Sequence, residues 1–271
     1  MQAINIDEAA IRLAIADKEA IAASFGKAAA TYDQHAAFQR DVGQRLLAQL
    51  PDDLTGSRVL DLGCGTGFFS QQLNARGAEV VCLDLSQPML EQARKRCGES
   101  GMRYQQGDAE CLPFADNQFD YVFSSLALQW CDDLAIPLGE MRRVTKPGGQ
   151  ALFSTLLEGS LNELKLAWRK IDTHQHVNDF VPLNQVNIAL AQSHCNNHHL
   201  DLASIVVWYD SAFSLMRDLK GIGANHVAGR SHGLTSRKML IQLEHEYQAF
   251  RKKHQGLLPA TYQVCLGIIN L

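Results

Sequence analysis

The chain has 271 residues, of which 46% are hydrophobic and 20% are charged, and its formal net charge is −4. This composition is ordinary for a globular protein, and the length suits one α/β domain that carries an insertion or a cover. The slightly acidic balance argues against broad, sequence-independent binding to nucleic acid, which requires many lysines and arginines, and leaves room for a local basic patch. We expect neither a signal peptide nor a membrane-spanning segment, because acids occur early and no stretch is long and apolar enough.

The seven cysteines are scattered, without a CxxC pair or the spacing of a metal site. Such a set is typical of free thiols in a reducing compartment rather than of a disulfide framework. We therefore expect a cytoplasmic protein.

The N-terminal part of the chain has a helical pattern. Apolar residues recur at helical spacing from Ile11 to Leu50, and Pro51 ends the pattern. Residues 1–52 are therefore predicted to form a helical cover that precedes the main domain.

Strands and helices alternate in residues 53–157. A strand, a glycine loop and a helix follow one another in residues 57–77, and a strand and a helix follow in 78–98. Three more strands are predicted within 102–110, 119–128 and 150–156. This order predicts an α/β, Rossmann-like fold with a mostly parallel sheet and helices on both faces.

The last third of the chain departs from this alternation. Residues 158–203 are polar and histidine-rich with short helical pieces, and we expect an inserted, lid-like segment. Residues 204–271 are expected to complete a seven-stranded sheet with antiparallel edge strands. Strands are predicted in 204–210 and 261–271, and helices in 210–223 and 236–253.

The histidines of the insertion do not predict a metal site. Their spacings lack a matching set of cysteine or acidic ligands. The five concerned are His174, His176, His194, His198 and His199.

The segment Asp61-Leu62-Gly63-Cys64-Gly65-Thr66-Gly67 lies between the first strand and its helix. Glycines at such a junction let the backbone turn sharply and approach a ligand closely. The loop lacks the third glycine of GxGxxG and the Lys-Ser/Thr pair of phosphate loops, which disfavours a pyrophosphate-bearing cofactor. An adenosine without phosphates fits better.

Three aspartates mark the ends of successive strands. Asp61 could order the glycine loop or meet a cationic amino group of the ligand. Asp84 could accept hydrogen bonds from both ribose hydroxyls, and Asp108 could reach the adenine amino group. Each residue alone could instead be a turn former or a helix cap, and only their combination favours a ligand site.

Five features of the chain occur in this order: DLGCGTG, the aspartate of the second strand, GDAECLPF, FDYVFSSLALQW and RRVTKPGG. On these features the chain resembles the class I S-adenosylmethionine methyltransferases over about residues 58–155. The resemblance implies S-adenosyl-L-methionine as the methyl donor and no metal. It also implies a cofactor site at the strand ends. We expect the N-terminal segment to fold over the cofactor, with Tyr32 as its candidate contact. The expected members are Asp61, Gly63, Gly65, Asp84, Leu85, Asp108, Ala109, Leu126 and Tyr32.

The flanking segments are FGKAAATYDQHAAFQ, GANHVAGRSHGLTSRKM and GLLPATYQV. These segments narrow the resemblance to one family, the malonyl-[acyl-carrier protein] O-methyltransferases of biotin synthesis. This implies methyl esterification of the free carboxylate of a malonyl thioester, with acyl carrier protein or coenzyme A as the carrier. A carboxylate is already ionised at neutral pH, so no general base is required.

Arginine is suited to bidentate recognition of a carboxylate. The candidates for the malonyl group are Arg142, Arg143 and Arg230, and solvated helix charges are the alternative reading of the first two. A basic face for an acidic carrier protein is expected on one C-terminal helix with Arg237, Lys238, Arg251, Lys252 and Lys253.

Two other functions stay open at this stage. The same cofactor half would serve a methyltransferase for another small carboxylic acid or a quinone-like ring. It would also serve a protein that binds the cofactor without catalysis.

Overall fold

The computed structural model describes residues 8–224, 236–251 and 256–271, with side chains described from residue 17 onward. The described strands form one seven-stranded sheet in the order β3-β2-β1-β4-β5-β7-β6. The strands are β1 (Arg58–Leu62), β2 (Glu79–Asp84), β3 (Met102–Gln106), β4 (Phe119–Ser125), β5 (Thr145–Leu156), β6 (His198–Tyr209) and β7 (Leu258–Asn270).

Pairing is parallel from β3 through β5, and β7 is antiparallel to both of its neighbours. The Rossmann-like, mostly parallel prediction is thus confirmed. The chain moves outward from β1 to β2 and β3, then returns to place β4 on the other side of β1. Ligands of open α/β sheets bind at such a reversal, outside the carboxyl ends of the strands.

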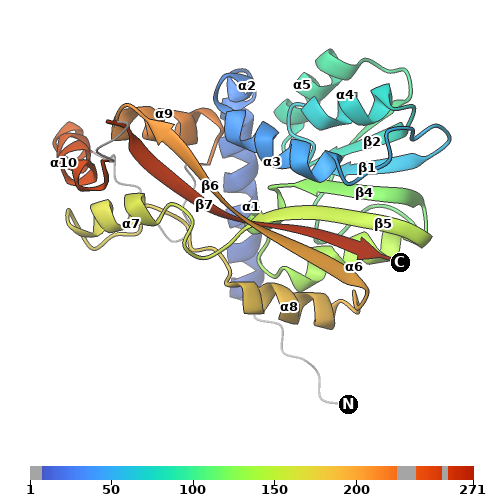
Figure 1. The fold of residues 1–271 in the computed structure, drawn as a ribbon. Helices are drawn as coiled ribbons and strands as arrows, with labels where there is room; N and C mark the ends of the chain where they lie inside the picture. The colour runs from blue at the N-terminus through green and yellow to red at the C-terminus, as the bar shows by residue number, and fades with distance from the viewer. Residues whose placement is uncertain (1–7, 225–235, 252–255) are drawn as a thin grey trace.

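Helices cover both faces of the sheet (Figure 1). The described helices are α1 (Glu8–Ala28), α2 (Tyr32–His35), α3 (Ala37–Leu47), α4 (Phe68–Ala75), α5 (Gln87–Cys97), α6 (Ala135–Val144), α7 (Asn162–Arg169), α8 (Leu183–Gln192), α9 (Ala212–Gly221) and α10 (Arg237–Tyr247), with 3-10 turns η1 (Leu128–Trp130) and η2 (Gln248–Phe250). Helices α3, α4 and α5 lie on one face, and α6 and α8 lie on the other.

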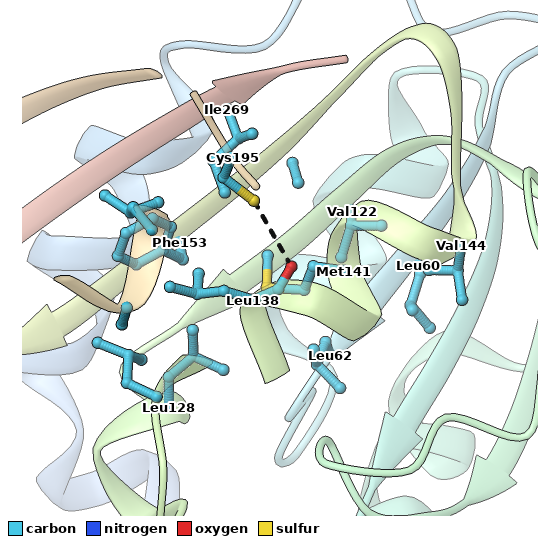
Figure 2. Packing of buried hydrophobic residues seen from close by; sticks show 14 of the residues in the cluster. Leu60, Leu62, Val122, Leu128, Leu138, Met141, Val144, Phe153, Cys195 and Ile269 are labelled. Carbon is cyan, nitrogen blue, oxygen red and sulfur yellow. Dashed lines mark hydrogen bonds between the residues drawn. The ribbon is translucent and has the colours of Figure 1, made fainter. Parts of the chain in front are cut away.

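The buried stripe of α6 shows how the sequence fixes this packing. Leu138, Met141 and Val144 recur three residues apart and are fully buried, so they point to one side of the helix. They pack in one cluster with Leu60 and Phe153 of the sheet (Figure 2). Burial of each large apolar side chain stabilises the fold by about 1.5–3 kcal/mol.

The sequence prediction for the last two strands is partly wrong. Strand β7 lies inside the sheet, between β5 and β6, and only β6 is an edge strand. Strand β6 begins at His198 rather than at Ser204. The polar, histidine-rich residues at the start of β6 did not show a strand pattern in the sequence, because an edge strand leaves alternate side chains in solvent.

The first half of β7 pairs with β6 alone, beyond the end of β5. Helices α7, α9 and α10 surround this two-stranded extension, and α1 crosses between it and the rest of the sheet (Figure 1). Trp168, Leu215, Leu243 and Tyr247 form its core. No described helix is both long enough and apolar enough to cross a membrane.

Candidate functional site

A cavity of about 780 Å³ opens at the carboxyl ends of the central strands, and we call it the strand-end cavity. Residues at or just after the ends of β1, β2, β3 and β4 line it, and α1 and η1 close it. Its members include Leu62, Gly63, Gly65, Leu83, Asp84, Leu85, Asp108, Ala109, Leu126 and Trp130.

Two glycines let the loop after β1 run along this cavity. Gly63 and Gly65 have φ values of +73° and +54°, which are strained for residues with a side chain. A Cβ atom on Gly63 would lie 2.4 Å from the Cβ of Ala127, whereas a Cβ on Gly65 would meet nothing within 4 Å. The bare backbone at Gly65 therefore leaves free space where a ligand can lie against the loop.

Asp84 at the end of β2 is fixed by backbone donors. Its Oδ2 accepts a hydrogen bond from the Gly65 amide at 2.9 Å, and its Oδ1 accepts one from the Ser86 amide at 2.8 Å. Burial raises the pKa of Asp84 to about 6, although the backbone hydrogen bonds oppose the shift. The carboxylate is thus mostly ionised at pH 7 and retains lone pairs for hydroxyl donors.

Asp61 lies behind the loop rather than among the residues of the strand-end cavity. It is 2% exposed, and its Oδ2 accepts a hydrogen bond from the Ser70 hydroxyl in α4. Burial raises the pKa of Asp61 to about 7, opposed by the Ser70 hydrogen bond and reinforced by Asp84. Of the two roles expected for Asp61, the geometry supports ordering of the loop.

Asp108 lines the cavity, but its partner is a residue that the sequence did not point to. Lys18 of α1 forms ion pairs with both Asp108 and Glu110. Burial lowers the pKa of Lys18, and the hydrogen bonds to the two carboxylates outweigh burial and raise it overall. No local motif signals this contact, because the partners lie 90 residues apart in the chain.

Leu126 follows β4 with a φ of +50°, which is uncommon for a side-chain-bearing residue and typical of a functional turn. Its amide donates to the Ser154 hydroxyl at 3.0 Å. Its side chain borders both the strand-end cavity and a neighbouring one.

That second cavity, of about 750 Å³, shares Phe25, Tyr32, Leu126 and Trp130 with the first, and we call it the adjoining cavity. Phe25 and Trp130 meet edge to face, with ring centroids 5.2 Å apart. The remaining walls are mainly apolar, with Phe38, Leu156, Leu161, Phe180, Leu219, Ile222 and Tyr262 among them.

A few polar groups converge on the adjoining cavity. The Oε1 atoms of Gln39 and Gln129 are buried without a hydrogen-bond partner in the described part of the chain. The Gln129 Nε2 donates to the Leu126 carbonyl at 2.7 Å, which fixes that amide. Burial and the nearby Asp84 carboxylate raise the pKa of Tyr32, so its phenol stays protonated. A concave apolar site with few oriented polar groups is typical of substrate binding.

None of the arginines expected to hold a carboxylate is among the described residues that line either cavity. Arg142 is exposed on α6. Arg143 pairs with Glu140 and Asp116 and donates to the Phe114 carbonyl at 2.7 Å. Arg230 lies outside the described residues.

The histidines of the insertion do not converge either. His176 Nε2 lies 2.9 Å from Asp172, and His198 Nδ1 lies 2.7 Å from the Cys195 carbonyl. Within the described ranges, no group of three His, Cys, Asp or Glu side chains is arranged to hold a metal ion. All seven cysteines are described, and each is a free thiol.

Comparisons with known proteins agree with this geometry. A methyltransferase domain model matches residues 60–153. The malonyl-[acyl-carrier protein] O-methyltransferase of Serratia marcescens is 44% identical over 254 residues, which cover 93% of this chain and 96% of the relative. A biotin biosynthesis bifunctional protein of Cellvibrio japonicus is 43% identical over 92% of this chain and 49% of its own length.

Solved structures show the same fold. Phosphoethanolamine N-methyltransferase 2 of Haemonchus contortus, in complex with S-adenosyl-L-methionine, matches with a TM-score of 0.58 at 18% identity. The match covers 90% of this chain and 57% of that one.

The fold, the glycine loop and the strand-end cavity define a class I methyltransferase. The chain belongs to the malonyl-[acyl-carrier protein] O-methyltransferase family, because the similarity to its members spans nearly the full length of both chains.

Proposed function

We propose that the protein transfers the methyl group of S-adenosylmethionine to the free carboxylate of a malonyl group carried as a thioester on acyl carrier protein. The product is the malonyl-carrier methyl ester, used in biotin synthesis, and the proposed compartment is the cytoplasm. The observation that carries the proposal is the 44% identity to the Serratia relative over 93% of the chain. The joined cavities support it, because they offer separate spaces for a cofactor and a substrate.

The residues of the strand-end cavity fit S-adenosylmethionine, which when bound supplies an electrophilic methyl group on a sulfonium. In our proposal, Asp84 accepts hydrogen bonds from the ribose hydroxyls and Asp108 binds at the adenine. Leu85 and Ala109 pack against the nucleoside, and Gly63 and Gly65 allow its close approach. Leu126 and Tyr32 stand at the passage to the adjoining cavity.

The malonyl carboxylate lies in the adjoining cavity in this proposal. It is ionised at neutral pH and needs no general base. The chain contributes alignment and exclusion of water, which in well-oriented systems lower a barrier by up to about 7–11 kcal/mol. Residues 1–52 and 158–203 act as covers in this arrangement, and they contribute Tyr32 and Phe180, respectively, to the lining.

Neutral donors hold the carboxylate in place of the arginines first considered. A bidentate guanidinium binds carboxylate oxygens strongly, which reduces their nucleophilicity. A rotation of the Gln39 amide presents an N–H where its unpartnered Oε1 now lies. The protonated Tyr32 phenol is a second donor. The Nε2 bond to the Leu126 carbonyl leaves the buried Oε1 of Gln129 as an acceptor beside the adjoining cavity, and in our proposal it accepts an amide N–H of the pantetheine arm.

The test is methyl transfer from labelled S-adenosylmethionine to malonyl-carrier protein, with succinyl-carrier protein and free malonate alongside. We expect a base-labile labelled ester on the malonyl carrier at the highest rate. Equal or faster labelling of free acids would favour the alternative, a methyltransferase for small carboxylic acids. Cofactor binding without transfer to any acceptor would contradict catalysis.

A further inference from the structure

An open groove lies between α1 and α9. We call it the α1–α9 groove. Lys27 of α1 and Arg217 and Lys220 of α9 line it and are exposed. It is separate from the strand-end and adjoining cavities and has no role in the mechanism proposed above.

The groove is basic although the chain as a whole is acidic. Lys27, Arg217 and Lys220 form no ion pair with any described residue, and no carboxylate is among the described lining residues. His35 also lines the groove, and its Nδ1 lies 2.7 Å from Asp218 beside the groove. Three exposed cations around one concave surface favour an acidic partner.

Several residues that line the groove are small. They are Ala20, Ala23 and Ala28 of α1 and Gly221 of α9. Gly221 is required here, because a Cβ atom on it would lie 2.2 Å from the His35 ring. Small residues beside exposed cations let a helix or loop of a partner come close to the backbone while its acidic side chains meet the cations.

The groove and the adjoining cavity share one wall. Leu219 of α9 and Ile222, which follows the last residue of that helix, line the adjoining cavity, whereas Arg217 and Lys220 of α9 line the groove. The wall is therefore one helix thick, about 10 Å. Where α9 ends, the Ser24 hydroxyl of α1 donates to the Gly223 carbonyl at 2.8 Å.

We propose that the α1–α9 groove docks the acidic surface of the carrier protein. The thioester-bearing arm then enters the adjoining cavity beside the end of α9. This inference rests on the proposed function. It replaces the expected docking face, because α10 ends at Tyr247 and leaves Arg251 outside the helix. Arg251 instead donates to the Gly256 carbonyl, and Lys252 and Lys253 lie outside the described residues.

The experiment compares two double variants, in each of which two exposed basic residues of one helix are replaced by glutamate. Arg217→Glu/Lys220→Glu changes the groove, and Arg237→Glu/Lys238→Glu changes the exposed bases of α10 as a matched control. Each variant is assayed with malonyl-carrier protein and with malonyl-pantetheine, which has the arm but no protein. Lys27→Glu tests the opposite wall of the groove.

For the groove variants we expect the KM for malonyl-carrier protein to rise about tenfold, with a weaker salt dependence than in the unmodified protein. The kcat/KM for malonyl-pantetheine is expected to stay unchanged. An unchanged KM for the carrier, equal losses on both substrates, or a larger loss in the α10 control would overturn the docking site. A failure of the unmodified protein to methylate either substrate would instead contradict the proposed function.

Discussion

Lys18 of α1 and Asp108, just after β3, form an ion pair at the mouth of the strand-end cavity. Glu110 also pairs with Lys18. Two carboxylates of the core thus share one cation from the N-terminal cover, and the contact ties α1 to the cofactor region.

Replacement of Lys18 by Met is expected to loosen α1. The two carboxylates lose their shared partner and repel each other, and a partly buried charged hydrogen bond is worth about 1.5–3 kcal/mol. Amide hydrogen exchange in residues 17–28 should accelerate by about tenfold or more. Lys27→Met is the control on the same helix, because Lys27 has no ion pair with a described residue. Equal rates of amide hydrogen exchange in the two variants would show that the Lys18 ion pairs do not hold α1 in place.

Asp84→Asn is expected to weaken S-adenosylmethionine binding by about 10- to 100-fold, because hydrogen bonds to a charged acceptor contribute about 1.5–3 kcal/mol. The amide still offers an oxygen to one backbone donor, so the fold should persist. Isothermal titration measures the dissociation constant. Asp120→Asn is the control, since Asp120 pairs with Lys146 and does not line the cavity. An affinity loss equal to that of the control would exclude the ribose contact.

The features that the sequence predicted well are those determined by residues close together in the chain. The glycine loop and the aspartates at strand ends follow from one strand–loop–helix repeat, so Gly65 and Asp84 could be placed together. The parts missed depend on distant contacts. Lys18 of α1 and Gln39 of α3 line the cavities only because these helices pack against the core in the folded chain. The position of β7 inside the sheet depends on its pairing with β6, sixty residues earlier in the chain.

Arg143 illustrates a residue whose type suggested one role and whose contacts indicate another. It joins α6 to the segment between β3 and β4 through Asp116 and the Phe114 carbonyl, and Glu140 of α6 also pairs with it. Arg143→Ala should lower the free energy of unfolding by about 1–3 kcal/mol and leave the KM for malonyl-carrier protein unchanged. Arg142→Ala, at an exposed position, should alter neither quantity. Urea denaturation and steady-state kinetics measure the two effects, and a raised KM in either variant would restore the arginine hypothesis.

Replacement of Gln39 should slow the methyl-transfer step more than it weakens cofactor binding. Gln39→Leu removes the proposed donor and should lower kcat by about tenfold or more, with an unchanged dissociation constant for S-adenosylmethionine. Gln39→Glu has nearly the same shape but repels the substrate carboxylate, so its activity should be lower still. A purely structural role would reverse this order, because the isosteric variant would then retain more activity than the leucine variant.

Asp61 makes the stability of the protein depend on pH. Its pKa rises from the usual 3.8 to about 7 in the folded protein, so the folded state holds a proton that the unfolded chain has lost between these values. Stability contributed by this group is therefore present at low pH and declines as the pH rises from about 4 to about 7. At about 1.4 kcal/mol per pH unit, the decline amounts to roughly 4 kcal/mol.

Asp61→Asn should remove this slope, because the amide does not ionise and its oxygen can still accept the Ser70 hydroxyl. The free energy of unfolding of the variant, relative to the unmodified protein, should therefore increase from pH 5 to about pH 7 and level off above it. Urea denaturation at several pH values measures it. Asp84→Asn is the comparison, and its relative gain should level off near pH 6, where the Asp84 carboxyl titrates. Parallel pH profiles for Asp61→Asn and the unmodified protein would show that Asp61 is ionised in the fold at no cost.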